Sequence, residues 1–375
     1  LAASVGACAD GEALEAPGPP TPDAGVALPP ACETEIIAGQ GAPGFAGDEG
    51  PARDAAFSRP RSISFDARGR IAVADFGNHR VRLIDEAGVI RTVLGTGTAS
   101  VASSPVPASG VTADDFGLNG PTRAEFDDDG TLLIADHFND RVLRLDVDAE
   151  WVTPVAGTGE RGFGGDGGPA AQAVLHRPRD MVRSRRGLLI SDLHNGRIRR
   201  IDASGVIQTI VGGPPDPVDD IETWTRSPDG TPALEARIGT PYGVAVDDAR
   251  GRIYLADSWA HRVAMVDESG VVRTVATGTT AGDGRLSGSL DELRLYQPRG
   301  LVVHDDGRLL VADLCNHRVV AIDPDLERWE AVGAAGVSCV PRAATVHGPI
   351  DVAVGPDGCV YVAHHHAHEI RRLAW

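Results

Sequence analysis

The stretch that decides the fold runs from Pro60 to Gly95 and contains four runs of β-branched and aliphatic residues. It reads Pro60-Arg-Ser-Ile-Ser-Phe-Asp66, then Ile71-Ala-Val-Ala-Asp75, then Asn78-His-Arg-Val81 with Leu83-Ile-Asp85, and finally Val89-Ile-Arg-Thr-Val-Leu-Gly95. Short runs of this kind, separated by turns rich in aspartate and glycine, are typical of antiparallel strands. The stretch therefore predicts a meander of four β-strands.

The same pattern recurs along the chain, and each copy opens with a proline. A four-stranded sheet cannot bury both of its faces alone, whereas a ring of such sheets packs face to face and leaves only short edges exposed. We therefore expect an all-β protein, a six-bladed β-propeller in which each blade is a four-stranded antiparallel meander. The six copies open at Pro60, Pro121, Pro178, Pro241, Pro298 and Pro349.

The last copy offers only three strands before Trp375. The segment 33–39, Glu-Thr-Glu-Ile-Ile-Ala-Gly, matches the outer strands of the other copies. We expect this N-terminal strand to complete the sixth blade, so that the propeller covers residues 32–375. Residues 1–31, rich in proline, alanine and glycine, are expected to form an exported, flexible tether.

Two sequence elements resemble a known family. Gly157-Thr-Gly-Glu-Arg-Gly-Phe-Gly-Gly-Asp-Gly-Gly-Pro-Ala170 is similar to the linker of bacterial NHL-repeat proteins, as is its counterpart at 39–60. An Asp-x-x-Asn-x-Arg element of the same family follows four of the second strands. The resemblance implies an NHL-repeat six-bladed β-propeller of the bacterial secreted or lipoprotein type. Because propellers serve many functions, the function has to be argued from a site.

Charge and composition exclude several kinds of chemistry. The formal net charge is −18, and the sequence contains no lysine, so all 35 basic side chains are arginines. Phosphate loops of the Walker type and Schiff-base enzymes need a lysine amine and are excluded. An acidic surface repels phosphate backbones, so we expect no nucleic-acid partner. No apolar run is long enough for a transmembrane helix.

The N-terminal residues and the cysteines favour a location outside the cytoplasm. Val5-Gly-Ala-Cys8 resembles the end of a bacterial lipoprotein signal, which makes Cys8 a candidate lipid anchor, although small residues also precede cysteine by chance. We predict disulfides between Cys315 and Cys339 and between Cys32 and Cys359. Four cysteines allow three pairings, and free thiols in a reducing cell are the alternative.

Three arginines give the sharpest hypothesis about binding. Arg61, Arg179 and Arg299 directly follow the opening prolines of blades one, three and five. In a six-fold ring they should approach three-fold symmetry near the channel mouth, where fixed guanidinium groups suit a carboxylate or phosphate ligand. Arg123, His176 and His347 lie close to these positions in the sequence. The alternative is that the arginines pair with acids on neighbouring blades.

Histidines suggest a second hypothesis, a metal site. His79, His261, His317 and His368 occupy equivalent turns, and amidating lyases related to NHL propellers bind zinc through histidines at comparable turns. In those lyases the histidines come from alternating blades. Here neither blades one, three and five nor blades two, four and six offer three histidines, which weakens the hypothesis of a three-ligand site. Blade six adds an unusual cluster, so the candidate metal ligands are His261, His364, His366 and His368.

No cofactor is required by this sequence, and zinc, copper or calcium are the ions considered. The Gly-Asp-Gly-Gly stretches lack the spaced carboxylates of a calcium loop and are interpreted as linkers. The aspartates that end the second strands are interpreted as scaffold residues that hold the following turn.

Two long connections, 96–120 and 213–240, are expected on the face of the channel mouth, and long ordered loops are often functional. We therefore expect an extracytoplasmic binding or scaffold propeller that recognises a protein or small anionic partner through this long-loop face. The alternative is a metal-dependent lyase or lactone hydrolase whose turn histidines hold a metal in the channel mouth.

Overall fold

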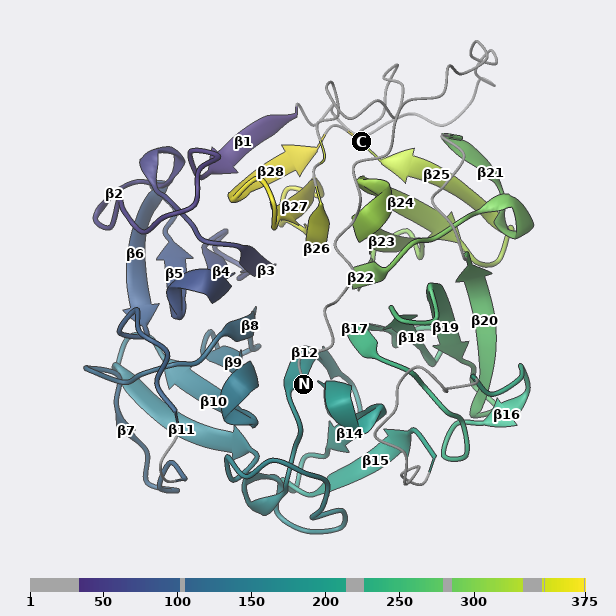
Figure 1. Ribbon diagram of the computed structural model, residues 1–375, viewed down its shortest axis with the longest axis horizontal. Helices are drawn as coiled ribbons and strands as arrows, with labels where there is room; N and C mark the ends of the chain where they lie inside the picture. Colours follow the sequence, from purple (N-terminus) through teal and green to yellow (C-terminus); the bar gives the residue numbers. More distant parts are fainter. Residues whose placement is uncertain are drawn as a thin grey trace, which may run out of the picture.

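The computed structural model describes residues 34–101, 105–213, 226–278, 285–332, 346, 348–373 and 375. It is an all-β ring of six antiparallel sheets, as predicted (Figure 1). Blade one consists of β2 (Gly50–Pro51), β3 (Pro60–Phe65), β4 (Ile71–Asp75), β5 (Arg80–Ile84) and β6 (Val89–Leu94). Blade two consists of β7 (Val111–Thr112), β8 (Pro121–Phe126), β9 (Leu132–Asp136), β10 (Arg141–Asp146) and β11 (Trp151–Ala156).

The remaining blades follow the same order around the axis. Blade three consists of β12 (Pro178–Ser184), β13 (Gly187–Asp192), β14 (Arg197–Ile201) and β15 (Ile207–Val211). Blade four consists of β16 (Thr231–Pro232), β17 (Pro241–Asp247), β18 (Arg252–Asp257), β19 (Arg262–Val266) and β20 (Val271–Thr277). Blade five consists of β21 (Ser287–Ser289), β22 (Pro298–Val303), β23 (Leu309–Asp313), β24 (Arg318–Asp323) and β25 (Arg328–Val332). Blade six consists of β26 (Pro349–Val354), β27 (Val360–His364), β28 (Glu369–Leu373) and β1 (Glu35–Ala38).

The N-terminal strand completes the sixth blade, as the sequence predicts. β1 pairs antiparallel with β28, with Glu35 opposite Arg372 and Ala38 opposite Ile370. The Arg372 guanidinium and the Glu35 carboxylate also form an ion pair at 2.7 Å. The ring is therefore closed by hydrogen bonds between the two ends of the described chain.

Short additional strands extend four of the sheets beyond the predicted four strands. β2, β7, β16 and β21 each pair with the outer strand of their blade. β7 and β16 come from the two long connections, so the described part of each connection adds to the outer edge of its blade. These two connections therefore form part of the outer edge of the ring, and not only the rim of the channel mouth.

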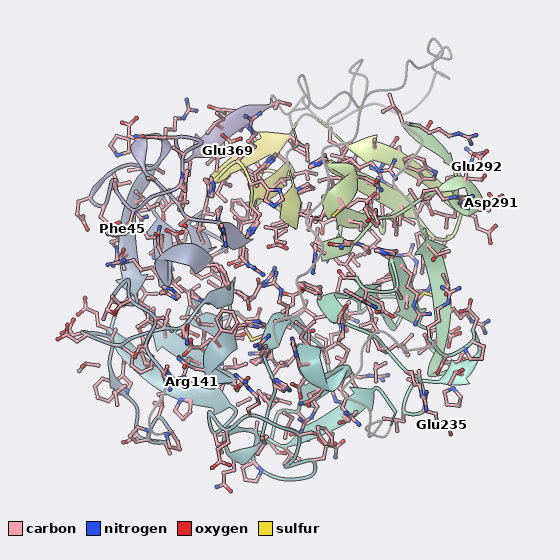
Figure 2. The ribbon with its side chains drawn as sticks, in the orientation of Figure 1. Phe45, Arg141, Glu235, Asp291, Glu292 and Glu369 are labelled. Atoms are coloured by element: carbon pink, nitrogen blue, oxygen red, sulfur yellow. The ribbon has the colours of Figure 1, made fainter. Side chains whose placement is uncertain are left out.

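The hydrophobic core is divided among the spaces between blades, which side chains fill (Figure 2). Successive residues of a strand point to opposite faces of the sheet. In β4, Ile71 and Val73 therefore pack toward blade six, whereas Ala72 and Ala74 pack toward blade two. Because both faces of β4 are covered, the four residues before its final Asp75 are all hydrophobic and do not alternate with polar residues.

The aspartates that end the second strands hold the following turn, as expected, and also bind the connection between blades. Asp75 accepts hydrogen bonds from the Ser58 backbone N–H at 2.8 Å and from the Asn78 amide at 2.7 Å. Asp136, Asp192 and Asp313 make the same pair of contacts. Burial raises the pKa of Asp75 to about 6 despite these bonds.

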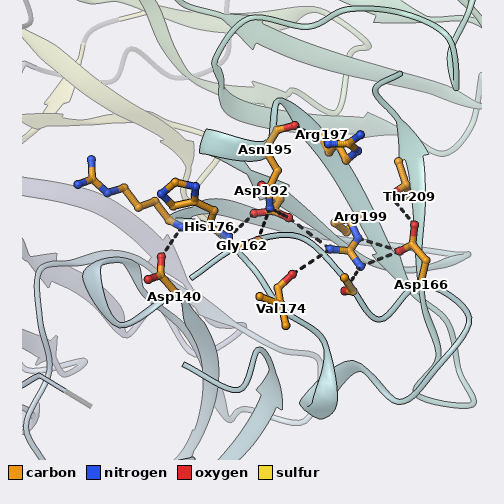
Figure 3. Close-up of polar contacts among 12 residues, drawn as sticks. Asp140, Gly162, Asp166, Val174, His176, Asp192, Asn195, Arg197, Arg199 and Thr209 are labelled. Atoms are coloured by element: carbon orange, nitrogen blue, oxygen red, sulfur yellow. Dashed lines mark hydrogen bonds and ion pairs between the residues drawn. The ribbon is translucent and has the colours of Figure 1, made fainter. Parts of the chain in front are cut away.

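The Gly-Asp-Gly-Gly linker is also structural (Figure 3). Asp166 accepts hydrogen bonds from the Thr209 hydroxyl at 2.7 Å and from the Arg199 guanidinium at 2.7 Å. Arg199 is fully buried and reaches Asp192 on its other side at 3.3 Å. At Gly165, φ is +86° and a Cβ would meet the Ala173 Cα at 2.7 Å, so the linker requires glycine there. The linker aspartate therefore neutralises a buried arginine.

The inner strands β3, β8, β12, β17, β22 and β26 begin at one face of the ring, which we call the mouth face. The residues before five of the six opening prolines have a left-handed backbone, among them Arg59 and Arg177 with φ of +54° and +55°. These segments thereby turn sharply onto the axis, where the first residues after all six prolines converge. Within the described residues, no helix has the length and apolar character needed to cross a membrane.

Candidate functional site

Residues from the inner strands of all six blades line a narrow cavity on the axis at the mouth face. The structure brings the predicted arginines together in its wall, which contains Arg61, Arg179 and Arg299 as well as Arg123. The volume open to the centre of a water-sized molecule is about 10 Å³, enough for about one water. Only a single small group can therefore enter the cavity in this state.

Arg61, Arg179 and Arg299, which we call the arginine triad, come from alternate blades and hold equivalent places directly after proline. Arg179 and Arg299 are only 5% and 6% exposed. The Arg299 Cζ lies 3.5 Å from the ring centroid of Tyr242, and the Arg179 Cζ lies 4.9 Å from the same centroid. Tyr242 therefore supports two of the three guanidinium groups from blade four, through contacts of the cation–π kind.

The triad has no carboxylate partner within the described part of the chain. The Arg299 side chain donates a hydrogen bond to the Gln297 Oε1 at 3.1 Å, and neither Gln297 nor Tyr242 is a carboxylate. Buried nitrogens of all three residues, namely Arg61 Nε, Arg179 Nη1 and Arg299 Nε and Nη1, find no hydrogen-bond acceptor among the described residues. Buried donors without acceptors are costly, and charged ones most of all. The triad thus presents donors that an incoming anion would satisfy.

The pKa values of the surrounding groups reflect this concentration of positive charge. Burial lowers the pKa of Arg61 well below its usual range, and the charge of Arg179 lowers it further. Burial also lowers the pKa of Arg179, to about 10, against an opposing effect of Tyr242 and with help from Arg299. Burial alone would raise the pKa of the Tyr242 phenol, but the triad outweighs it and lowers that pKa to about 8.

Arg123 lines the same cavity but is paired with acids. Its guanidinium lies 2.6 Å from Glu125, 2.9 Å from Asp351 and 3.3 Å from Asp180. Asp351 also accepts the Ile63 N–H. Burial raises the pKa of Glu125 to about 7 and that of Asp351 to about 6. Pairing with acids, including acids of other blades, is therefore found for Arg123. It is not found for the triad among the described residues.

The turn histidines hold neighbouring blades together. His79 has a left-handed backbone with φ of +51°, and its Nδ1 accepts a hydrogen bond at 3.0 Å from the Gly120 N–H of the next blade. In blade two, Asp140 takes the place of histidine and accepts the Arg177 N–H at 2.7 Å. The equivalent bonds join His261 to Gln297, His317 to Gly348 and His368 to Arg59. Because this hydrogen bond recurs from blade to blade, we interpret the role of the histidines as structural.

The four candidate metal ligands are not gathered into one site. His364 is fully buried at the end of β27, His366 is exposed in the following turn, and His261 belongs to blade four. Across the described ranges, no group of three or more histidine, cysteine, aspartate or glutamate side chains is placed to hold a metal ion. The fit of these residues to zinc, copper or calcium is therefore poor, and the metal site stays a hypothesis.

The other predicted residues lie beside the cavity or outside the described residues. The His176 backbone N–H donates to Asp192, and its ring lies 4.8 Å from that of His194, away from the cavity wall. Cys315 and Cys359 are each disulfide-bonded. Cys339, Cys32, Cys8 and His347 lie outside the described residues, so the two pairings and the lipid anchor stay predictions.

Sequence reasoning missed the acids Asp180 and Asp351 in the cavity wall and two further residues, Tyr242 and Arg177. Tyr242 directly follows the opening proline of blade four and therefore occupies the same repeat position as the triad residues. Alignment of the six copies is enough to predict that it lies beside them. Arg177 precedes Pro178 and makes an Arg-Pro-Arg sequence with Arg179, and the same sequence occurs at 59–61. A search of both positions next to each proline would have found Tyr242 and Arg177.

Comparison with known families supports the repeat. The Teneurin NHL domain family matches residues 30–157, and the NHL repeat family matches residues 295–322. NHL repeat-containing protein 2 from Bos taurus is 27% identical over 307 residues, which are 76% of this chain and 41% of the bovine protein. This chain therefore spans less than half of the length of that relative.

Solved structures show the same fold at low sequence identity. An auxiliary nutrient binding protein from Bacteroides ovatus has a TM-score of 0.61 at 13% identity, covering 91% of this chain and 76% of that chain. A gluconolactonase from Xanthomonas campestris has a TM-score of 0.55 at 12% identity, covering 85% and 87%. The family matches and the six-bladed architecture fit an NHL-repeat propeller. The bacterial secreted type expected from the sequence is not confirmed by the bovine relative.

Proposed function

We propose that this NHL-repeat propeller is a binding protein that captures an anionic group of a small partner in its channel mouth. The observation that carries the proposal is the arginine triad, whose three guanidinium groups are gathered in one narrow cavity without an ion pair among the described residues. Arginine donors in a fixed arrangement suit carboxylate and phosphate oxygens. Burial strengthens such contacts because water no longer competes for them.

The surroundings of the triad support binding more than catalysis. Arg123 and its three acids close the cavity below the triad, and their charges already neutralise one another in part. The fold itself does not decide between binding and catalysis, because its structural neighbours include both a nutrient binding protein and a gluconolactonase. A protein partner would use the same face, with an acidic side chain entering the cavity.

A location outside the cytoplasm is part of the proposal. The disulfide-bonded state of Cys315 and Cys359 supports it, because disulfides persist in oxidising compartments. Alkylation of free thiols in the protein purified from its native source, followed by mass spectrometry, would test this point. Protected Cys315 and Cys359 would support export, and freely alkylated cysteines would contradict it.

Binding is tested by thermal melting and calorimetric titration in a chloride-free buffer at pH 7, with acetate and inorganic phosphate as probes. We expect either probe to raise the melting temperature, since a ligand at 100 times its dissociation constant stabilises a protein by about 2.7 kcal/mol. Arg299→Met should abolish the response. Arg273→Met, which removes an arginine paired with Asp267 at 2.7 Å in the hairpin turn before β20, should retain it.

Two results would overturn the proposal. One is a wild-type protein that responds to neither probe at tens of millimolar, and the other is an Arg299→Met variant that responds as the wild type does. Elemental analysis of the same preparations tests the metal-dependent lyase or lactone hydrolase. A stoichiometric metal that is lost when His261 and His368 are changed to alanine would favour that alternative.

A further inference from the structure

Positive charge at the mouth extends beyond the arginine triad. Arg59 and Arg177 stand directly before the opening prolines of blades one and three, two residues from Arg61 and Arg179. Arg59 is exposed and Arg177 is half-buried. The labelled acidic side chains Glu235, Asp291 and Glu292 lie at the outer rim of the ring, far from the axis (Figure 2). A protein of formal net charge −18 thus carries arginines around its axis, next to the three acids that pair with Arg123.

Arg177 is held in place by its backbone, whereas its guanidinium forms no ion pair in the described part of the chain. Its backbone N–H donates to the Asp140 carboxylate at 2.7 Å, which fixes the chain before Pro178. Its Nη1 lies 3.3 Å from the His194 Nε2, and its Cζ lies 5.4 Å from the ring centroid of Phe138. Its buried Nε finds no acceptor, and its guanidinium no carboxylate, in the described part of the chain.

His137 connects Arg177 to the triad. Its ring is buried, and its Nδ1 lies 3.0 Å from the Pro178 carbonyl oxygen, to which it can donate a hydrogen bond. Burial lowers the pKa of His137 well below its usual range, and the charges of Arg179, Arg61 and Arg177 lower it further. The charges of two triad residues and of Arg177 therefore act on the same imidazole, which places Arg177 in the electrostatic neighbourhood of the triad.

Cavity size and a row of aromatic rings set the shape of a ligand. The cavity admits one small group, so the remainder of any larger molecule has to lie across the rim. The Arg177 Cζ lies 5.4 Å from the Phe138 ring centroid, the Phe138 and Phe76 centroids lie 5.8 Å apart, and the Arg61 Cζ lies 3.9 Å from the Phe76 centroid. Because Arg177 and Arg61 flank one pair of rings, a short linker between two anionic groups suits this arrangement.

We propose that the mouth recognises a compact ligand with two anionic groups, one among Arg61, Arg179 and Arg299 and the second at the rim against Arg177. This inference rests on the proposed function and adds the valence and shape of the ligand. His194, exposed next to Arg177, borders the rim position and offers a ring nitrogen there. Carboxylate and phosphate share this chemistry, and the experiment distinguishes them.

The test is calorimetric titration of the whole protein in a chloride-free buffer at pH 7 with matched pairs of probes. Glutarate is compared with butyrate, a monocarboxylate with a similar short carbon chain, and pyrophosphate is compared with orthophosphate. We expect glutarate to bind about tenfold more tightly than butyrate, because its second carboxylate adds one charge-assisted hydrogen bond. If pyrophosphate binds more tightly than orthophosphate while glutarate and butyrate bind equally, the site recognises phosphate ligands.

Arg177→Gln should reduce the affinity for glutarate to that for butyrate. The matched control is Arg161→Gln, which removes a neighbouring arginine paired with Asp140 at 3.3 Å and should keep the preference. Melting curves of both variants verify folding. Equal affinity of the wild type for the members of both pairs, or an unchanged preference in Arg177→Gln, would overturn the inference while leaving anion capture by the triad intact. Failure of Arg299→Met to lose binding would instead overturn the proposed function.

Discussion

Replacing Arg179 with methionine should make the ligand-free protein more stable. Burial and the charge of Arg299 hold the pKa of Arg179 near 10, below its usual value, so the protonated guanidinium is less favourable in the folded protein than in the unfolded chain. At 1.36 kcal/mol for each unit of pKa, this difference corresponds to about 3 kcal/mol of destabilisation at pH 7. Because the folded-state pKa is the lower one, the cost is fully present below pH 10 and fades only as the pH rises beyond it.

Methionine keeps most of the apolar volume of the arginine stem, so little packing should be lost. We expect a gain of about 1 to 3 kcal/mol in the free energy of unfolding, measured by urea denaturation and followed by tryptophan fluorescence. The matched control is Arg123→Met, one layer below the triad. Arg123 is paired with three carboxylates, so its loss should cost about 3 to 5 kcal/mol.

The two variants change the same residue type in the same cavity, yet their effects should have opposite signs. A destabilisation of Arg179→Met comparable to that of Arg123→Met would mean that Arg179 has an anionic partner within the protein. The reasoning that leads from the triad to an external anion would then be refuted. Such an outcome would direct attention to carboxylates beyond the described residues.

Two further predictions follow from the pKa values and the linkers. Ultraviolet absorbance at alkaline pH should reveal one phenol in the wild type that ionises near pH 8 and is missing in Tyr242→Phe, since the triad lowers the pKa of Tyr242 to about 8. Because the folded-state pKa is the lower one, the stability advantage of wild type over Tyr242→Phe should grow from pH 8 to 10, and a constant difference would contradict this. Asp166→Asn should cost about 1.5 to 3 kcal/mol in urea denaturation, because the fully buried Arg199 loses its 2.7 Å ion pair. Asp148→Asn, at an exposed turn position, serves as the control and should cost almost nothing.

The arrangement of the blades is predictable from the sequence because each copy repeats a proline, a hydrophobic strand and an aspartate at fixed places. All six inner strands begin at the predicted prolines, and the strand at Glu35–Ala38 closes the ring. The two-residue strands β2, β7 and β16 are not predictable, because strands that short carry no hydrophobic period. Their pairing depends on the outer strand that they meet.

The convergence of the arginine triad was also predictable, because equivalent repeat positions meet on the axis of a ring. The sequence did not reveal which arginines would be paired. Arg123 is the second residue after its proline, whereas the triad residues are the first, and successive residues of a strand point in opposite directions. This offset places Arg123 in the acidic layer with Asp180 and Asp351, which are also second after their prolines.

The histidines show the limit of reasoning from residue type. Imidazoles at equivalent turns suggested metal ligands, but in the structure their Nδ1 atoms accept backbone hydrogen bonds from the next blade. Asp140 accepts the same backbone hydrogen bond in blade two. The position therefore favours a residue that tolerates a left-handed backbone and whose side chain can accept a hydrogen bond. Repetition around the ring was the signal that favoured a structural role.

The most direct test of the central claim is a crystal structure of the protein soaked in bromide, with anomalous diffraction recorded at the bromine absorption edge. The account predicts an anomalous peak within hydrogen-bond distance of the guanidinium groups of Arg61, Arg179 and Arg299, and loss of that peak in Arg299→Met. A triad without a peak, occupied by a carboxylate of the chain itself, would contradict the claim that the channel mouth captures an external anion.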